Sequence, residues 1–201
     1  PQNVIALHLP TKTSHPRHTQ DAQLVATHAQ IPPANQLTIP VASPIQKTWR
    51  IIKHYTNPIT VQGTSLHSTE LLPFTNPAKG SPYRRQHLTQ LTSLNRLRLA
   101  NLTARLRMAL LFDQAKTHDA LVIGTENLSE HLLGYFTRFG DQASDLEPIR
   151  HLYKTQVIQL AQHLKIPSPI IDKPPSADLW PSQTDAGELG FTYQEADPIL
   201  Y

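Results

Sequence analysis

Apolar and polar residues alternate with clear periods at the start of the chain. Residues 3–10, NVIALHLP, are a short apolar run stopped by proline, which predicts a buried strand followed by a loop. Residues 21–31 repeat alanine and valine at helical spacing before a Pro-Pro pair, and 36–41 predict a second strand. Residues 1–41 therefore predict a strand–helix–strand unit of an α/β protein.

The periodicity is lost over residues 42–95 and then returns. Residues 42–95 are rich in Thr, Pro, His, Gln and Asn, and predict loop with short helical pieces, a poorly specified surface insertion. In the remaining part, 96–201, the predicted elements are a largely apolar helix, a strand, a short helix and an amphipathic helix, at 101–115, 119–124, 128–136 and 152–164. This alternation predicts one domain over 1–201, with a parallel sheet flanked by helices and ligands beyond the carboxyl ends of its strands.

Composition narrows the function only slightly. A net charge of +3 is too small and dispersed to indicate a nucleic-acid-binding protein. The chain has no cysteine, so neither a disulfide framework nor a thiolate metal site is expected. Its longest apolar runs are about five residues, against the roughly 20 that cross a bilayer, and no secretion signal opens it. We expect a cytoplasmic protein without membrane or nucleic-acid partners.

Two arginines on the 101–115 helix are distinguished by the pattern. Arg107 falls on the polar stripe with Thr103 and Gln114, whereas Arg105 falls among apolar residues. Arg105 either lays its stem along the core or holds a bound anion or carboxylate.

Three residues near predicted element ends are candidates for binding. Thr125 follows a glycine just after a predicted strand, where its hydroxyl can reach a phosphate or ribose. Glu130 stands three residues after Asn127, so it either completes a capping box or binds Mg²⁺ at a nucleotide. Lys154 lies in the first turn of its helix, where a cation opposes the helix dipole unless an anion is bound there.

The loop at 138–145, RFGDQASD, is either a solvated turn or part of a site. It carries Arg138, Asp141 and Asp145. The sequence lacks a Walker-type loop, a G-x-S-x-G and an H-E-x-x-H, and its HPRH at 15–18 is a weak metal candidate beside proline.

A series of segments resembles the NAD synthetase family in order and spacing. They are ARLRM (104–108), LVIGTENLSE (121–130), GYFTRFGD (134–141), PIRHLYKTQV (148–157), KPPSADLWPSQTD (173–185) and ELGFTYQEADPIL (188–200). The resemblance is continuous over about the last hundred residues, weaker at NVIALHLP, and not clear between them. It implies an adenine-nucleotide α-hydrolase-like, Rossmann-like fold and a homodimer.

The resemblance also implies a ligase reaction and a set of site residues. Deamido-NAD is adenylated by ATP with Mg²⁺ as cofactor, and ammonia, free or from a glutaminase domain upstream, then displaces AMP to give NAD. Thr125, Lys154 and Ser176 match the ATP contacts, Glu130 matches the magnesium ligand, and Arg105, Arg138 and Asp145 match positions that hold deamido-NAD. No protein nucleophile is implied, because the chemistry needs cations around phosphates.

The sequence departs from the family pattern at several positions, and these departures support an alternative interpretation of its function. The family's Ser-Gly-Gly-x-Asp-Ser phosphate loop is expected before NVIALHLP, and a His-Lys pair after the last residue; neither occurs here, so we expect an N-terminally truncated member, weak or inactive on its own. Gln142 and Ala143 replace glycines, Arg138 replaces a lysine, and Leu128 stands where a polar residue is common. The alternative is a degenerate, inactive relative that acts as a dimeric nucleotide-binding or structural protein. Another ATP pyrophosphatase would need different substrate motifs.

Overall fold

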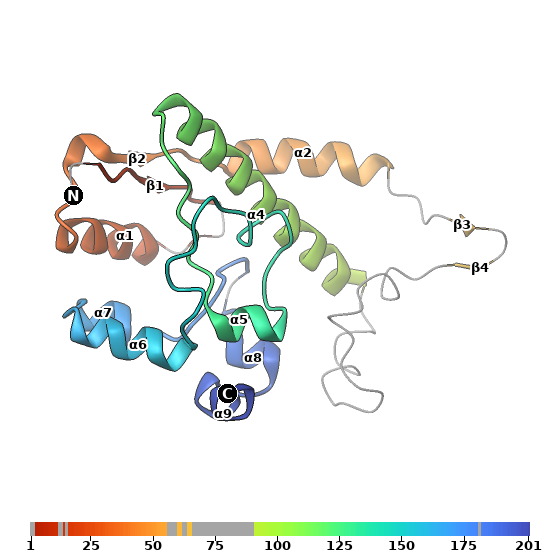
Figure 1. The fold of residues 1–201 in the computed structure, drawn as a ribbon. Helices are drawn as coiled ribbons and strands as arrows, with labels where there is room; N and C mark the ends of the chain where they lie inside the picture. The colour runs from red at the N-terminus through yellow and green to blue at the C-terminus, as the bar shows by residue number, and fades with distance from the viewer. Residues whose placement is uncertain are drawn as a thin grey trace.

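The computed structural model is mostly helical, with a small parallel pair of strands at the upper left of Figure 1. The residues it describes are 3–11, 14, 16–55, 60–61, 64–65, 91–180 and 182–201. Strand β1 (Ala6–His8) pairs in parallel with β2 (Gln36–Thr38), with Leu7 opposite Leu37. Helix α1 (Pro16–His28) connects them and is followed by the short 3₁₀ turn η1 (Pro33–Asn35). The predicted strand–helix–strand unit is therefore confirmed.

The chain then forms a helix where the sequence predicted mostly loop. Helix α2 (Ala42–Tyr55) follows Val41, and Val41 and Ile45 at its start are buried in the core. The apolar residues in this stretch have helical spacing, but it was not recognised among the surrounding Thr, Pro and His. The loop prediction was therefore wrong for this stretch. Farther on, the structure describes the hairpin β3 (Thr60–Val61) and β4 (Thr64–Ser65). The rest of the predicted insertion up to residue 90 lies outside the described residues.

Helix α4 (Leu91–Thr117) crosses the middle of the molecule and contains the predicted helix 101–115 (Figure 1). The buried core beside it is formed by Leu9, Val41 and Ile45. Partly buried leucines of α4 pack against that core: Leu99, Leu106, Leu110 and Leu111. Helix α4 thus joins the strand pair to the elements that follow it. No helix in the described part of the chain is long and apolar enough to span a membrane.

The predicted strand at 119–124 is reduced to a single parallel bridge between Ile123 and Leu146. The Gly124 N–H donates to the Leu146 carbonyl at 2.7 Å, and the Asp145 N–H donates to the Val122 carbonyl at 2.9 Å. The partner is a short piece of loop, so a longer ladder does not form with it. Leu121 and Ile123 consequently stay 68% and 54% exposed.

Short helices complete the lower half of the molecule in Figure 1. They are α5 (Leu128–Leu133), α6 (Lys154–His163), α7 (Ser168–Ile171), α8 (Asp185–Leu189) and α9 (Tyr193–Leu200). Helix α5 ends three residues earlier than predicted because Gly134 adopts a left-handed conformation with φ 66°. Helix α6 falls within the predicted 152–164.

Candidate functional site

Glu130 at the start of α5 has the first of its two predicted roles, that of completing a capping box, and it also pairs with a lysine. Its Oε2 accepts a hydrogen bond from the Asn127 N–H at 3.2 Å, and the Asn127 side chain accepts from the Glu130 N–H at 3.1 Å, so the capping box is present. Its Oε1 lies 2.8 Å from Lys154 Nζ in an ion pair. One carboxylate oxygen therefore caps the helix, and the other faces a cation.

The sequence suggested that an anion binds at the start of α6, but two backbone N–H groups there donate to side chains of the protein. The Lys154 N–H donates to Ser129 Oγ at 2.8 Å, and the Thr155 N–H donates to Asp197 Oδ2 at 2.9 Å. Ser129 in turn donates to Asp197 Oδ1 at 2.5 Å. Buried groups of α5 and α9 therefore satisfy these two donors. These two N–H groups are therefore not free for the anion that the position of Lys154 suggested, and the Lys154 ammonium pairs with Glu130.

Buried polar residues lie next to the Lys154 side chain. The Lys154 ammonium is 5.3 Å from the ring centroid of Tyr193, whose hydroxyl donates to Asp185 Oδ2 at 2.9 Å. Asp185 is only 3% exposed, and its Oδ1 is buried without a hydrogen-bond partner. Burial raises the pKa of Asp185, while hydrogen bonding by Tyr193 and the charge of Lys154 oppose that rise. Lys154 thus pairs with Glu130 and lies near enough to Asp185 for its charge to lower the pKa of that carboxyl.

Ser176 lies on the loop between α7 and α8. It is exposed, and its Oγ accepts a hydrogen bond from the Asp178 N–H at 3.0 Å. The neighbouring Pro175 carbonyl accepts from the Asp185 N–H at 2.9 Å, which ties the loop to the start of α8. Asp178 also pairs with His18 Nδ1 at 2.6 Å. His18, which the sequence offered as a weak metal candidate, therefore contacts the loop of Ser176.

Arg105 and Arg138, which the resemblance assigns to deamido-NAD, are in contact. The Arg105 Nε–H donates to the Arg138 carbonyl at 3.0 Å, and both side chains belong to exposed residues. The sequence pattern assigned Arg105 to an apolar side and Arg107 to a polar stripe, and the structure reverses this. Arg107 is partly buried and donates to the Leu9 carbonyl at 3.1 Å. Burial lowers the pKa of Arg107. The apolar side of the pattern is partly open to solvent, since Phe112 is 38% exposed.

The loop of residues 137–147, hereafter the 137–147 loop, carries Arg138 and Asp145 and docks on α4. Thr137 donates to Asn101 Oδ1 at 3.0 Å. A Cβ on Gly140 would lie 2.9 Å from the Cβ of Ala104, so the absence of a side chain there permits the close approach. At its other end, Asp145 Oδ2 accepts from the Val122 N–H at 2.8 Å.

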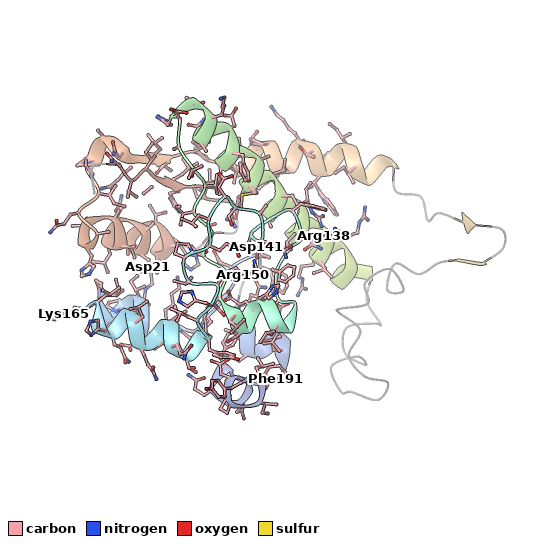
Figure 2. All side chains as sticks on the ribbon, in the orientation of Figure 1. Asp21, Arg138, Asp141, Arg150, Lys165 and Phe191 are labelled. Atoms are coloured by element: carbon pink, nitrogen blue, oxygen red, sulfur yellow. The ribbon has the colours of Figure 1, made fainter. Side chains whose placement is uncertain are left out.

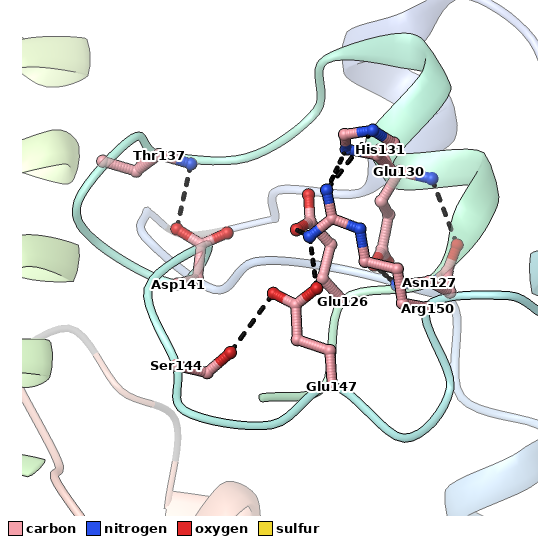
Figure 3. Close-up of polar contacts among 9 residues, drawn as sticks. All are labelled: Glu126, Asn127, Glu130, His131, Thr137, Asp141, Ser144, Glu147 and Arg150. Atoms are coloured by element: carbon pink, nitrogen blue, oxygen red, sulfur yellow. Dashed lines mark hydrogen bonds and ion pairs between the residues drawn. The ribbon is translucent and has the colours of Figure 1, made fainter. Parts of the chain in front are cut away.

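Arg150 joins this loop to α5 (Figures 2 and 3). Its guanidinium contacts Glu147, lies 3.3 Å from Glu126 Oε2, and donates to His131 Nδ1 at 2.7 Å. Glu126 is 6% exposed, and its Oε1 is buried without a hydrogen-bond partner. Burial raises the pKa of Glu126 to about 7, an effect that Arg150 opposes and Glu147 reinforces. Sequence reasoning missed both residues, although each lies inside a motif that it quoted.

The structure brings the predicted residues into two contacting pairs. Glu130 contacts Lys154, and Arg105 contacts Arg138. Thr125 is exposed two residues before the N-cap of α5. Asp145 is held by the Val122 N–H, and Ser176 is held by Asp178 of its own loop. No group of three or more potential protein ligands that could hold a metal ion occurs among the described residues.

The parallel strands with their connecting helix, and the polar residues gathered beyond the 119–124 segment, define an α/β protein of the Rossmann-like class. The NAD synthase family profile matches residues 76–201. The chain therefore belongs to the NAD synthase family.

Individual relatives agree with this membership. An ammonia-dependent NAD synthetase of Chlorobaculum tepidum is 55% identical over 107 residues, which are 53% of this chain and 39% of that protein. The Fusobacterium nucleatum ammonia-dependent NAD synthetase is 36% identical over 200 residues, covering 100% of this chain and 61% of that protein. A solved structure of NMN synthetase from Francisella tularensis superposes with a TM-score of 0.74 at 31% identity, covering 98% of this chain and 65% of the other. The chain thus spans between two fifths and two thirds of the length of these relatives.

Proposed function

We propose that this chain carries out the synthetase reaction of its family, ATP-dependent amidation of deamido-NAD to NAD with ammonia as nitrogen donor. The nicotinate carboxylate would attack the α-phosphate of ATP, with release of pyrophosphate. Ammonia would then attack the acyl carbon, and AMP would leave as the new amide loses a proton. The observation that carries the proposal is the Glu130–Lys154 contact, a carboxylate and an ammonium 2.8 Å apart at adjoining helix starts.

Such a pair suits a nucleotide with a divalent cation. Mg²⁺ in proteins usually keeps waters and takes one or two carboxylates together with substrate phosphates, so Glu130 Oε1 fits as a single protein ligand without a closed cage. When bound, the ion would neutralise charge on the phosphates and the leaving pyrophosphate. Glu130 Oε1 would have to exchange Lys154 for the ion, which leaves the ammonium available to a phosphate oxygen. Thr125 and Ser176 would add exposed hydroxyls for ATP.

We assign the second substrate to the other pair. Arg105 and Arg138 place two guanidinium groups at the junction of α4 and the 137–147 loop, and Arg138 also lies 4.8 Å from the ring centroid of Phe139. Cations and an exposed aromatic ring suit the phosphates and bases of a dinucleotide. Asp145, held at the Val122 N–H, would accept from a ribose or amide of deamido-NAD.

Further properties of the reaction are part of the proposal. We expect a homodimer, a cytoplasmic location and free ammonia as the donor, with a glutaminase domain on a longer chain as the other source. Sedimentation equilibrium of the purified chain tests the dimer. Glutamine in place of ammonium chloride tests the donor.

The assay measures binding and turnover separately. Calorimetric titrations with ATP·Mg²⁺ and with deamido-NAD are compared for wild type, Glu130→Gln and Lys154→Ala. Both variants should weaken ATP·Mg²⁺ at least about tenfold, since each removes a charge-assisted contact, and should leave deamido-NAD binding nearly unchanged. Lys165→Ala changes an exposed lysine just beyond the far end of α6 and serves as the control (Figure 2).

The outcomes separate four possibilities. NAD formation from deamido-NAD supports the proposal. The Francisella tularensis neighbour is named an NMN synthetase, so nicotinate mononucleotide is supplied as a second substrate, and preference for it would move the assignment to the mononucleotide. Binding without turnover of either substrate would favour the inactive nucleotide-binding alternative. The absence of any binding at millimolar ligand would refute the site.

A further inference from the structure

The Arg150 side chain contacts three residues around the proposed site, Glu126, His131 and Glu147 (Figure 3). Glu126 belongs to the segment that follows the Ile123 bridge, Glu147 closes the 137–147 loop, and His131 is on α5 beside Glu130. A guanidinium has several fixed donors and no acceptor, so one group can hold two carboxylates and an unprotonated ring nitrogen in a set geometry.

The acidic groups around Arg150 would not stay together without it. Glu126 and Glu147 both contact its guanidinium, and Asp141 and Glu130 are close enough to Glu126 to raise its pKa further. Glu126 has one buried oxygen without any partner, so Arg150 is the only cation that the described contacts give to its carboxylate. Removing the guanidinium would take away the donors shared by Glu126, Glu147 and His131, and the end of the loop would move away from Glu126.

The residues next to the contacts of Arg150 are closely packed. A Cβ on Gly124 would lie 2.5 Å from Ser144 Oγ, and Ser144 donates to Glu147 Oε1 at 3.2 Å. The loop end therefore rests directly on the backbone before Glu126. A shift of Glu147 would be transmitted to Asp145, two residues away, and through the loop to Arg138.

We propose that Arg150 is a positioning residue whose guanidinium holds the 137–147 loop, with Arg138 and Asp145, in register with the helix that bears Glu130. The role rests on the proposed function, because it links the half of the site assigned to deamido-NAD to the half assigned to ATP. Arg150 is not one of the residues assigned to bind ATP or deamido-NAD. It acts through Glu147, Glu126 and His131.

Hydrogen–deuterium exchange of the chain without ligands tests the structural half of this proposal. The variants are Arg150→Gln, which removes the charge, and Arg150→Lys, which keeps it, with Arg50→Gln on the exposed side of α2 as control. Arg150→Gln should speed exchange about tenfold or more at the amides of Gly124 and Asp145, whose bonds join the loop to the 122–124 segment, with α9 unchanged. Arg150→Lys should restore part of the protection. Unchanged exchange in Arg150→Gln, or an equal rise throughout the chain, would overturn the proposal.

Ligand binding tests the functional half. Arg150→Gln should weaken deamido-NAD about tenfold or more, since small misplacements of binding groups are costly, while ATP·Mg²⁺ affinity changes much less. General loosening of the fold would instead weaken both ligands alike, which would contradict a positioning role. A further outcome is that wild type binds no deamido-NAD while exchange in Arg150→Gln still rises as expected. In that case the contacts of Arg150 hold the loop in the fold, but the proposed function and the positioning role both fail.

Discussion

Gly124 is a residue at which a single methyl group has a clear cost. Its hypothetical Cβ lies 2.5 Å from Ser144 Oγ and 2.9 Å from Glu147 Cγ, so Gly124→Ala must push the loop end outward. We expect about 1–3 kcal/mol of destabilisation, the usual range for overpacking. Urea unfolding measures it. A stability equal to wild type would mean that the 144–147 segment yields freely.

Glu126 predicts a pH dependence of stability. Its pKa is raised from 4.5 to about 7, with burial as the main cause, so the unfolded carboxyl ionises first as the pH rises. Between those values the folded state binds more protons, and the free energy of unfolding falls with rising pH, by up to about 1.4 kcal/mol per unit from this group.

Glu126→Gln removes this titration and should flatten the stability profile across that window. Comparing denaturant unfolding of both proteins at several pH values gives the contribution of Glu126, together with its coupling to Asp141. Parallel profiles would show that the pKa of Glu126 is the same in the folded and unfolded protein, which would contradict the prediction.

At the scale of elements, the junction of α5, α6 and α9 depends on Asp197. Its carboxylate accepts from Ser129 and from the hydroxyl and N–H of Thr155, and the residue is 5% exposed. Asp197→Ala would leave these donors buried without partners, so we expect a loss of about 2–4 kcal/mol. Thermal unfolding measures it, with the exposed Asp113→Ala on α4 as control. A loss no larger than that of the control would contradict the capping role.

The sequence predicted elements well where the pattern was local. The first parallel unit, the helix around Arg105 and the helix that begins at Lys154 follow from periodicity and proline stops. The junction at Asp197 could not be predicted, because its partner Ser129 is 68 residues away and the pattern carries no information about such pairs. Arg150 was missed for the same reason, because the sequence does not indicate that its partners come together when the loop folds back onto α5. The resemblance supplied site residues whose roles remain predictions.

At the scale of the whole molecule, α4 contacts both the early and the late parts of the chain. Arg98 lies 5.3 Å from the ring centroid of Trp49 on α2, and Arg96 lies 5.8 Å from that of Trp180 in the loop after α7. The two tryptophans, the only ones in the sequence, therefore report on opposite sides of one helix.

We expect both parts to unfold together, because they share the packing on α4. Single-tryptophan variants, Trp49→Phe and Trp180→Phe, should give the same fluorescence midpoint in urea once corrected for their own effects on stability by circular dichroism. Two separated midpoints would show that the parts before and after α4 are independent cooperative units.

The contact between Ser129 and Asp197 also sets an order of events during translation. The α5–α6 junction needs a carboxylate that the ribosome adds 68 residues after the serine. At about 5–20 residues per second, this delay lasts roughly 3 to 14 s. During that time Ser129 and Thr155 lack the carboxylate that accepts their hydrogen bonds in the folded chain, so we expect the proposed ATP half of the site to assemble only after α9 has emerged.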